Sequence, residues 1–120
     1  MEKTSLFTGD YTIKGLESIL TIERKSLGDW VKTCIHDWIR FRKQLYRMAG
    51  MDLAAIVVEA NVGDVWERKY ETEALPQSII GKAHACLIDH GVPVIWGGDR
   101  KYCIPLVERI FIQAAEKMLK

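Results

Sequence analysis

The chain has 120 residues, and its 17 lysine and arginine side chains against 16 aspartate and glutamate side chains give a net charge of +1. This length fits one domain with one hydrophobic core. Apolar residues make up 48% of the sequence and charged residues 28%, which excludes a disordered polyelectrolyte and a histone-like basic protein. Nucleic-acid binding is not excluded, because local patches of charge determine it rather than the total.

The sequence predicts neither a membrane span nor a signal peptide. No apolar run approaches the roughly 20 residues that cross a bilayer, and the first five residues lack a basic start followed by an apolar stretch. Cys34, Cys86 and Cys103 are widely spaced and form no Cys-x-x-Cys pair. They are typical of reduced thiols in a cytoplasmic protein, not of disulfides or a zinc site.

The chain begins with a predicted β-hairpin. Apolar and polar side chains alternate over residues 7–14 and again over 19–25, and a four-residue connection with glycine at its start separates the two segments. This pattern predicts two antiparallel strands. If the chain turns between residues 16 and 17, paired residue numbers sum to 33, and Asp10 lies directly across from Glu23.

The hydrophobic period then changes from two residues to between three and four. This change predicts one long amphipathic helix over about 27–49, which ends at Gly50. Ser26 begins this helix, and Asp29 follows three residues later in the spacing of a capping box.

The rest of the chain alternates between strands and helices. A continuous β-branched run predicts a strand over 54–60 that is covered on both faces, and the polar residues 61–75 indicate a loop with a helical turn. A helix over 77–90, a short strand over 93–96 and a final helix with Pro105 in its opening turn follow. The sequence therefore predicts a mixed α/β fold.

The residues that carry chemistry lie at the end of the hairpin. Residues two apart in a strand share a face, so Glu23 and Lys25 point the same way and Arg24 points the opposite way. With Asp10 opposite Glu23, two carboxylates have Cβ atoms about 4.5–5.5 Å apart. A divalent cation neutralises such a pair, and oxygen ligands without histidine or cysteine suit Mg²⁺ or Mn²⁺. Lys25 would then orient the attacking water or neutralise charge on a phosphate, as phosphodiester hydrolysis requires.

An isolated Glu-x-Lys on a strand is more often a solvated salt bridge. The chain contains a second copy of the tripeptide, Glu67-Arg68-Lys69, which follows no apolar strand and has no Gly-Asp partner. We interpret that copy as surface. The first copy differs in its preceding aspartate, its hairpin and the helix that follows it.

Gly9-Asp10, followed by Glu23-Arg24-Lys25 and then by Asp29, resembles the nuclease-domain signature of the XPF family of structure-specific endonucleases, the ERCC-type nuclease domain. That family is a branch of the restriction-endonuclease-like superfamily. The resemblance continues through the long helix and the later strands, and it implies a single nuclease domain over residues 1–120, similar to compact phage and bacterial versions. The implied fold is restriction-endonuclease-like α/β, a mixed central sheet with an N-terminal catalytic hairpin flanked by helices.

The resemblance also implies the roles of five residues. Asp10 and Glu23 would bind Mg²⁺ or Mn²⁺, Lys25 would be the catalytic lysine, and Arg24 and Asp29 would support them. Arg24 would hold the hairpin against its neighbours or touch the substrate, and Asp29 would cap the helix or contact the metal through water. Relatives usually carry a further acidic strand before the Gly-Asp pair. We expect that strand to be missing here, which would affect both the metal site and one edge of the sheet.

Further cations are candidates for contacts with the DNA backbone, and each is also compatible with a solvated surface. They lie on the long helix and after the Gly97-Gly98 pair: Arg40, Arg42, Lys43, Arg47, Arg100 and Lys101. The final helix is broadly apolar, which indicates burial on more than one side. Because relatives dimerise through this domain, we expect a homodimer or heterodimer that forms through the C-terminal helices.

Two functions remain open, besides a plain surface hairpin in a protein with no nucleic-acid role. The first is an Mg²⁺- or Mn²⁺-dependent DNA endonuclease that hydrolyses phosphodiester bonds in branched, flap or junction DNA during repair or recombination. The second is a catalytically silent scaffold that dimerises or binds DNA for an active nuclease partner. Silent relatives typically lose the Glu-Arg-Lys residues, which this chain keeps. In either case we expect no membrane partner and a cytoplasmic location in a prokaryotic or phage-infected cell, associated with the nucleoid at most.

Overall fold

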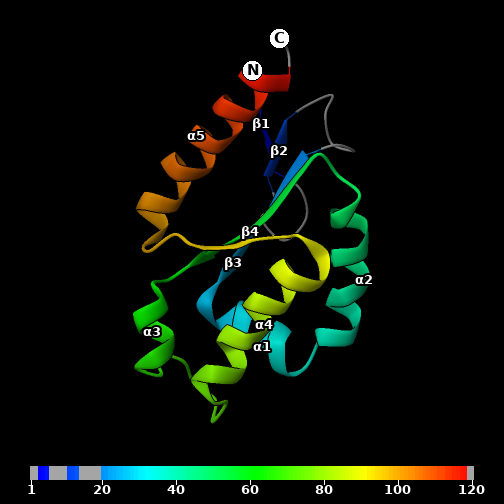
Figure 1. Ribbon diagram of the computed structural model, residues 1–120. Coiled ribbons are helices and arrows are strands. Elements are labelled where there is room, and N and C mark those ends of the chain that lie inside the picture. Colours follow the sequence, from blue (N-terminus) through cyan, green and yellow to red (C-terminus); the bar gives the residue numbers. More distant parts are fainter. Residues whose placement is uncertain (1–2, 6–10, 14–19, 119–120) are drawn as a thin grey trace.

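The computed structural model describes residues 3–5, 11–13 and 20–118. Within these residues, five strands form one sheet in the order β1-β2-β3-β4-β5 (Figure 1). The strands are β1 (Lys3–Ser5), β2 (Tyr11–Ile13), β3 (Leu20–Ser26), β4 (Leu53–Glu59) and β5 (Val94–Trp96). The helices are α1 (Leu27–Ile35), α2 (Trp38–Ala49), α3 (Val62–Trp66), α4 (Pro76–His90) and α5 (Arg100–Met118).

The sheet is mixed, as the sequence predicts. β1, β2 and β3 pair antiparallel, whereas β3, β4 and β5 are parallel. Parallel neighbours need crossover connections, and helices supply them between β3 and β4 and between β4 and β5. The fold is therefore an α/β sheet with an N-terminal antiparallel hairpin and flanking helices.

The register between β2 and β3 follows the predicted sum of 33, because Tyr11 pairs with Ile22. Asp10 and the predicted turn, residues 14–19, lie outside the described residues. The sequence does not predict β1, since Lys3-Thr4-Ser5 has no apolar alternation. This strand pairs with β2 through Ser5 and Tyr11, among others.

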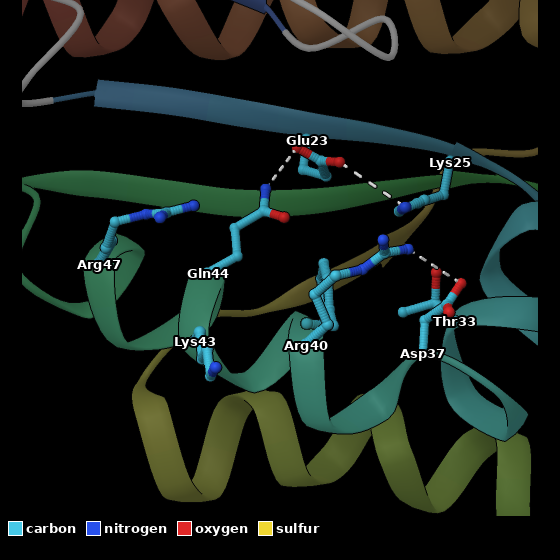
Figure 2. A pocket seen from close by; sticks show the side chains of 9 residues that line it. Glu23, Lys25, Thr33, Asp37, Arg40, Lys43, Gln44 and Arg47 are labelled. Atoms are coloured by element: carbon cyan, nitrogen blue, oxygen red, sulfur yellow. Dashed lines mark hydrogen bonds and ion pairs between the residues drawn. The ribbon is translucent and has the colours of Figure 1, made fainter.

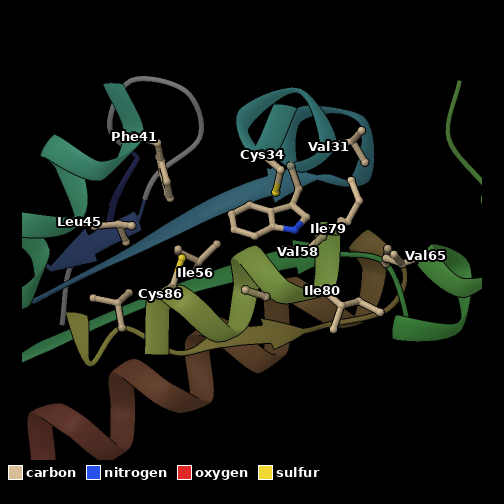
Figure 3. Packing of buried hydrophobic residues seen from close by; sticks show 14 of the residues in the cluster. Val31, Cys34, Phe41, Leu45, Ile56, Val58, Val65, Ile79, Ile80 and Cys86 are labelled. Carbon is tan, nitrogen blue, oxygen red and sulfur yellow. The ribbon is translucent and has the colours of Figure 1, made fainter. Parts of the chain in front are cut away.

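β4 is buried on both faces, as its continuous apolar run predicts. Ile56 and Val58 pack into a cluster formed with α1, α2 and α4, where Figure 3 shows Ile56 close to Cys86 and Val58 close to Ile79, both of α4. The alternate residues Ala55 and Val57 face the other side and pack against α5. One layer of helices thus covers each face of the parallel part of the sheet, and the free thiols of Cys34, Cys86 and Cys103 are buried in these layers.

The predicted single helix over 27–49 is wrong, because the chain forms two helices that break at His36 and Asp37. The hydrophobic period continues across the break without glycine or proline, so the pattern alone gives no sign of it. A straight helix of that length would span about 35 Å, whereas a strand of seven residues spans about 23 Å. Turning the chain lets both helices pack against the sheet, and it places α2 alongside α4 (Figure 1).

Close packing joins β5 to α5. A Cβ atom at Gly97 would lie 2.5 Å from Cys103 Sγ and 3.1 Å from Val57 Cγ1, so any side chain here would force its neighbours to shift. Pro105 lies in the second turn of α5 rather than in its opening turn, because the helix begins at Arg100. None of the helices in the described part of the chain is long and apolar enough to cross a membrane.

Candidate active site

The candidate site is built on β3, whose side chains alternate between the two faces of the sheet. Leu20 and Ile22 pack toward α5. Glu23 and Lys25 both line a pocket on the opposite face, next to α1 and α2. The structure therefore confirms that these two side chains share a face, which follows from the period of two in an extended strand.

The pocket has a volume of about 440 Å³ and lies between β3 and the helices α1 and α2 (Figure 2). Its lining combines four cationic side chains with two carboxylates, so its formal charge is +2. The lining residues are Glu23, Lys25, Thr33, Asp37, Arg40, Phe41, Lys43, Gln44 and Arg47. A concave site of this charge is suited to a phosphate-rich ligand.

The carboxylate of Glu23 lies at the inner wall of the pocket, and the residue is only 3% exposed. Gln44 Nε2 on α2 donates a hydrogen bond of 2.8 Å to Glu23 Oε2. The ammonium of Lys25 lies 3.8 Å from the other oxygen, Oε1. Figure 2 shows both contacts converging on Glu23 from opposite sides. A buried carboxylate needs such partners, because an unpaired buried charge costs several kcal/mol.

Lys25 has a mostly buried side chain, with 17% of it exposed. Its Nζ lies 5.5 Å from the ring centroid of Phe41, which is itself in the core. The aromatic ring and the Glu23 carboxylate thus limit the positions that the ammonium can adopt. The ammonium of Lys25 is therefore held in a restricted position inside the pocket.

Of the cations predicted to contact phosphates, some line the pocket and others lie outside it. Arg40, Lys43 and Arg47 lie three and four residues apart on α2 and line the pocket, as helical spacing requires. Arg40 also lies 3.4 Å from Asp37 in an exposed ion pair. Arg42 is exposed and does not line the pocket. Arg100 and Lys101 begin α5 and do not line it either.

Arg24 points to the other face of the sheet, away from Glu23 and Lys25. Its Nη1 lies 2.6 Å from Oε1 of Glu59, which ends β4. Arg100 Nε lies 3.9 Å from the other oxygen of Glu59. These contacts tie β3, β4 and the start of α5 together at one end of the sheet. They fit the expectation that Arg24 holds the hairpin strand against its neighbours.

Ser26 is the N-cap of α1, as predicted. Its Oγ accepts a hydrogen bond of 3.1 Å from the backbone N–H of Asp29. The side chain of Asp29 is exposed at the first turn and does not line the pocket. The cap begins the helix directly after β3, which fixes the direction in which the chain leaves the site.

Asp10, the other predicted metal ligand, lies outside the described residues. Within residues 3–5, 11–13 and 20–118, no group of three or more histidine, cysteine, aspartate or glutamate side chains is arranged to hold a metal ion. Of the two predicted ligands, the described structure therefore places Glu23 alone, and it places it in the pocket.

Sequence reasoning missed four residues that line the pocket: Thr33, Asp37, Phe41 and Gln44. Thr33 is buried on α1, and Asp37 lies at the break between α1 and α2, which the sequence did not reveal. Gln44 falls at the border of the apolar face of α2, between the buried Phe41 and Leu45. A polar residue at the border of an apolar helix face is a sequence signal that could have identified Gln44 as a candidate site residue.

Solved structures of other proteins have a fold similar to that of this chain. XPF from Aeropyrum pernix matches 92% of this chain with a TM-score of 0.69 and 22% sequence identity. XPF from Aeropyrum pernix in complex with DNA matches 95% of this chain with a TM-score of 0.65 and 20% identity. This chain covers 48% and 52% of those two structures, so it spans about half of their length. No curated protein sequence matches the chain.

The model of the ERCC4 domain family matches residues 1–110, which is most of the chain. This match and the XPF-like fold confirm the resemblance that the Gly-Asp and Glu-Arg-Lys residues indicate. The chain belongs to the ERCC4 domain family.

Proposed function

We propose that this chain is the nuclease domain of a DNA endonuclease that depends on Mg²⁺ or Mn²⁺. The observation that carries the proposal is the pairing of Glu23 and Lys25 on one face of β3, inside a pocket of net positive charge. Membership in the ERCC4 domain family supports it. The structural relative whose description names a complex with DNA supports DNA as the substrate.

The donor chemistry at this site fits a hard divalent cation. Glu23 offers carboxylate oxygens at the wall of the pocket, and Asp10 directly precedes Tyr11, which pairs with Ile22. The hairpin register expected from the sequence pairs Asp10 with Glu23. We infer that Asp10 and Glu23 hold the cation, since Mg²⁺ and Mn²⁺ prefer oxygen ligands. The bound cation would supply Lewis-acid polarisation of the phosphodiester.

Side chains of the protein itself would bind the phosphates and position the reacting groups. Lys25 would donate a hydrogen bond to a phosphate oxygen, or orient the attacking water, from its position between Glu23 and Phe41. Arg40, Lys43 and Arg47 would bind neighbouring phosphates along the mouth of the pocket. Arg42, Arg100 and Lys101 lie outside the pocket and would contact DNA only beyond the cleaved bond.

The substrate that we propose is branched, flap or junction DNA, as met in repair and recombination. We propose that the active form is a dimer that joins through the C-terminal helices, where Leu87 and Ile88 of α4 and Ile104 of α5 are exposed. Sedimentation velocity of the chain with these residues changed to serine tests the dimer. The buried free thiols support a reducing cytoplasm as its location.

The deciding experiment measures Mg²⁺-dependent cleavage of a labelled flap substrate by the unchanged chain and by Asp10→Ala and Lys25→Ala. Both variants should lose cleavage by at least about 100-fold while they remain folded by circular dichroism. Equal cleavage by either variant would overturn the proposed roles. Binding of DNA without cleavage and without Mn²⁺ binding by the unchanged chain would instead identify a catalytically silent scaffold.

A further inference from the structure

Gln44 donates a hydrogen bond to the buried carboxylate of Glu23. The donor Nε2 lies 2.8 Å from Oε2, and 21 residues separate the two positions in the chain. Gln44 comes from α2, whereas Glu23 comes from β3, so the contact depends on how the helix packs on the sheet. Figure 2 shows the Gln44 side chain extending from the helix to Glu23 across the inner end of the pocket.

From this contact we infer that Gln44 is a positioning residue that orients the Glu23 carboxylate for binding the divalent cation, an inference that rests on the proposed function. The terminal torsion of glutamate is broad, so packing of the stem does not fix the plane of the carboxylate. A hydrogen bond to one oxygen fixes that plane. Mg²⁺ demands near-ideal octahedral geometry, so a ligand whose plane is fixed binds better than one that rotates.

Gln44 is uncharged, and its neutrality matters for metal binding at Glu23. The charged side chains of α2 that line the pocket are all cationic: Arg40, Lys43 and Arg47. A fourth cation at position 44 would form an ion pair with Glu23 and repel the metal. A carboxylate there would repel Glu23 itself. A carboxamide donates a hydrogen bond without adding charge, so it orients Glu23 and brings no further cation beside Lys25.

The local packing holds Gln44 in place. Phe41, Leu45 and Met48 form the buried face of α2, and Gln44 lies at its border, half-buried. Phe41 also lies below the ammonium of Lys25, 5.5 Å from Nζ to the ring centroid. One short segment of α2 therefore positions both functional side chains of β3, Glu23 through a hydrogen bond and Lys25 through a ring contact.

Titration of Mn²⁺ into the full chain without DNA, by calorimetry or by the electron paramagnetic resonance of free Mn²⁺, tests this inference. Gln44→Leu removes the donor at similar volume and should weaken Mn²⁺ binding about 10- to 100-fold. Gln44→Lys should weaken it further. Gln113→Leu makes the same change at an exposed position of α5 and should bind Mn²⁺ as the unchanged chain does.

Cleavage kinetics give a second readout. Gln44→Leu should lower kcat and leave the KM for DNA within about twofold, because the residue acts through Glu23 and not on the phosphates. If Gln44→Leu does not fold, Gln44→Asn replaces it. The shorter side chain keeps the amide but does not reach Glu23, and the same loss of Mn²⁺ affinity is expected.

Unchanged Mn²⁺ affinity in a folded Gln44→Leu or Gln44→Asn variant would overturn this inference and leave the proposed function intact. Absence of Mn²⁺ binding by the unchanged chain would overturn both. A fall in melting temperature with no change in Mn²⁺ affinity would assign Gln44 a structural role alone.

Discussion

Arg24 Nη1 lies 2.6 Å from Glu59 Oε1, on the face of the sheet opposite Glu23 and Lys25. The three consecutive residues of the Glu-Arg-Lys tripeptide therefore have two separate tasks. Its first and last residues line the pocket, and its middle residue joins β3 to the end of β4. The side-chain alternation of a strand produces this division.

Breaking the Arg24–Glu59 pair should lower the stability of the fold without changing metal binding. The two side chains are 22% and 8% exposed, so removing one partner leaves the other charge largely buried. Arg24→Leu should lower the free energy of unfolding by about 3 kcal/mol. Chemical denaturation measures this change, and Mn²⁺ affinity of the folded variant should be unaltered.

Two further variants control this prediction. The double variant Arg24→Leu with Glu59→Leu should be less destabilised than the two single changes added together, because neither charge then remains unpaired. Lys69→Gln breaks an exposed ion pair with Asp64 and should cost under about 1 kcal/mol. Additive losses in the double variant would contradict the pairing.

The basic side of α2 predicts how DNA binding depends on salt. Changing Arg40, Lys43 and Arg47 together to glutamine should reduce the slope of log affinity against log salt concentration by about 0.9 for each DNA phosphate that is no longer neutralised. Fluorescence anisotropy over a series of salt concentrations measures this slope. Arg109→Gln alters an exposed cation on α5 and should leave it unchanged. An unaltered slope in the triple variant would mean that DNA does not follow this helix.

The buried cysteines predict a dependence of stability on alkaline pH. Burial raises the pKa of Cys34 and of Cys86 from 9.0 to about 12 in each case. The folded state therefore favours the protonated thiols. Their contribution to stability is fully present below pH 9 and is lost as the pH rises toward 12. Unfolding free energies measured across this range should fall less steeply in Cys34→Ala than in the unchanged chain.

The same thiols should not react in the folded protein, because the thiolate is the nucleophile and burial suppresses it. A chromogenic disulfide reagent at pH 8 should label fewer than one thiol per folded chain and all three after denaturation. Rapid labelling of the native chain would contradict the buried positions.

A side chain introduced at position 97 should lower the stability of the fold for steric reasons. Its missing Cβ would lie 2.5 Å from Cys103 Sγ, so Gly97→Ala should destabilise the chain by about 1–3 kcal/mol. Gly81→Ala is the matched control, since no atom lies within 4 Å of that Cβ and the residue is in the interior of α4. It should stabilise the chain by about 0.5–1 kcal/mol. Thermal melts of the two variants should therefore shift in opposite directions.

Local patterns predicted most of the elements correctly. The period of two identified β3 and its register with β2, and the unbroken apolar run identified β4 as a doubly covered strand. They failed where the deciding interaction is not local. β1 has no apolar alternation and is a strand because it pairs with the edge of β2. The break between α1 and α2 follows from packing on a sheet of limited length.

The sequence alone predicts that Glu23 and Lys25 share one face and that Arg24 takes the other, because alternation in an extended strand needs no distant partner. It also determined the family, through residues whose spacing along the chain carries the signature. Three features depend on the packing of the whole chain: which cations of α2 reach the pocket, the pairing of Arg24 with Glu59, and the hydrogen bond from Gln44 to Glu23. Those contacts join positions 21 and 35 residues apart, and their geometry depends on how the helices pack on the sheet, which no local pattern encodes.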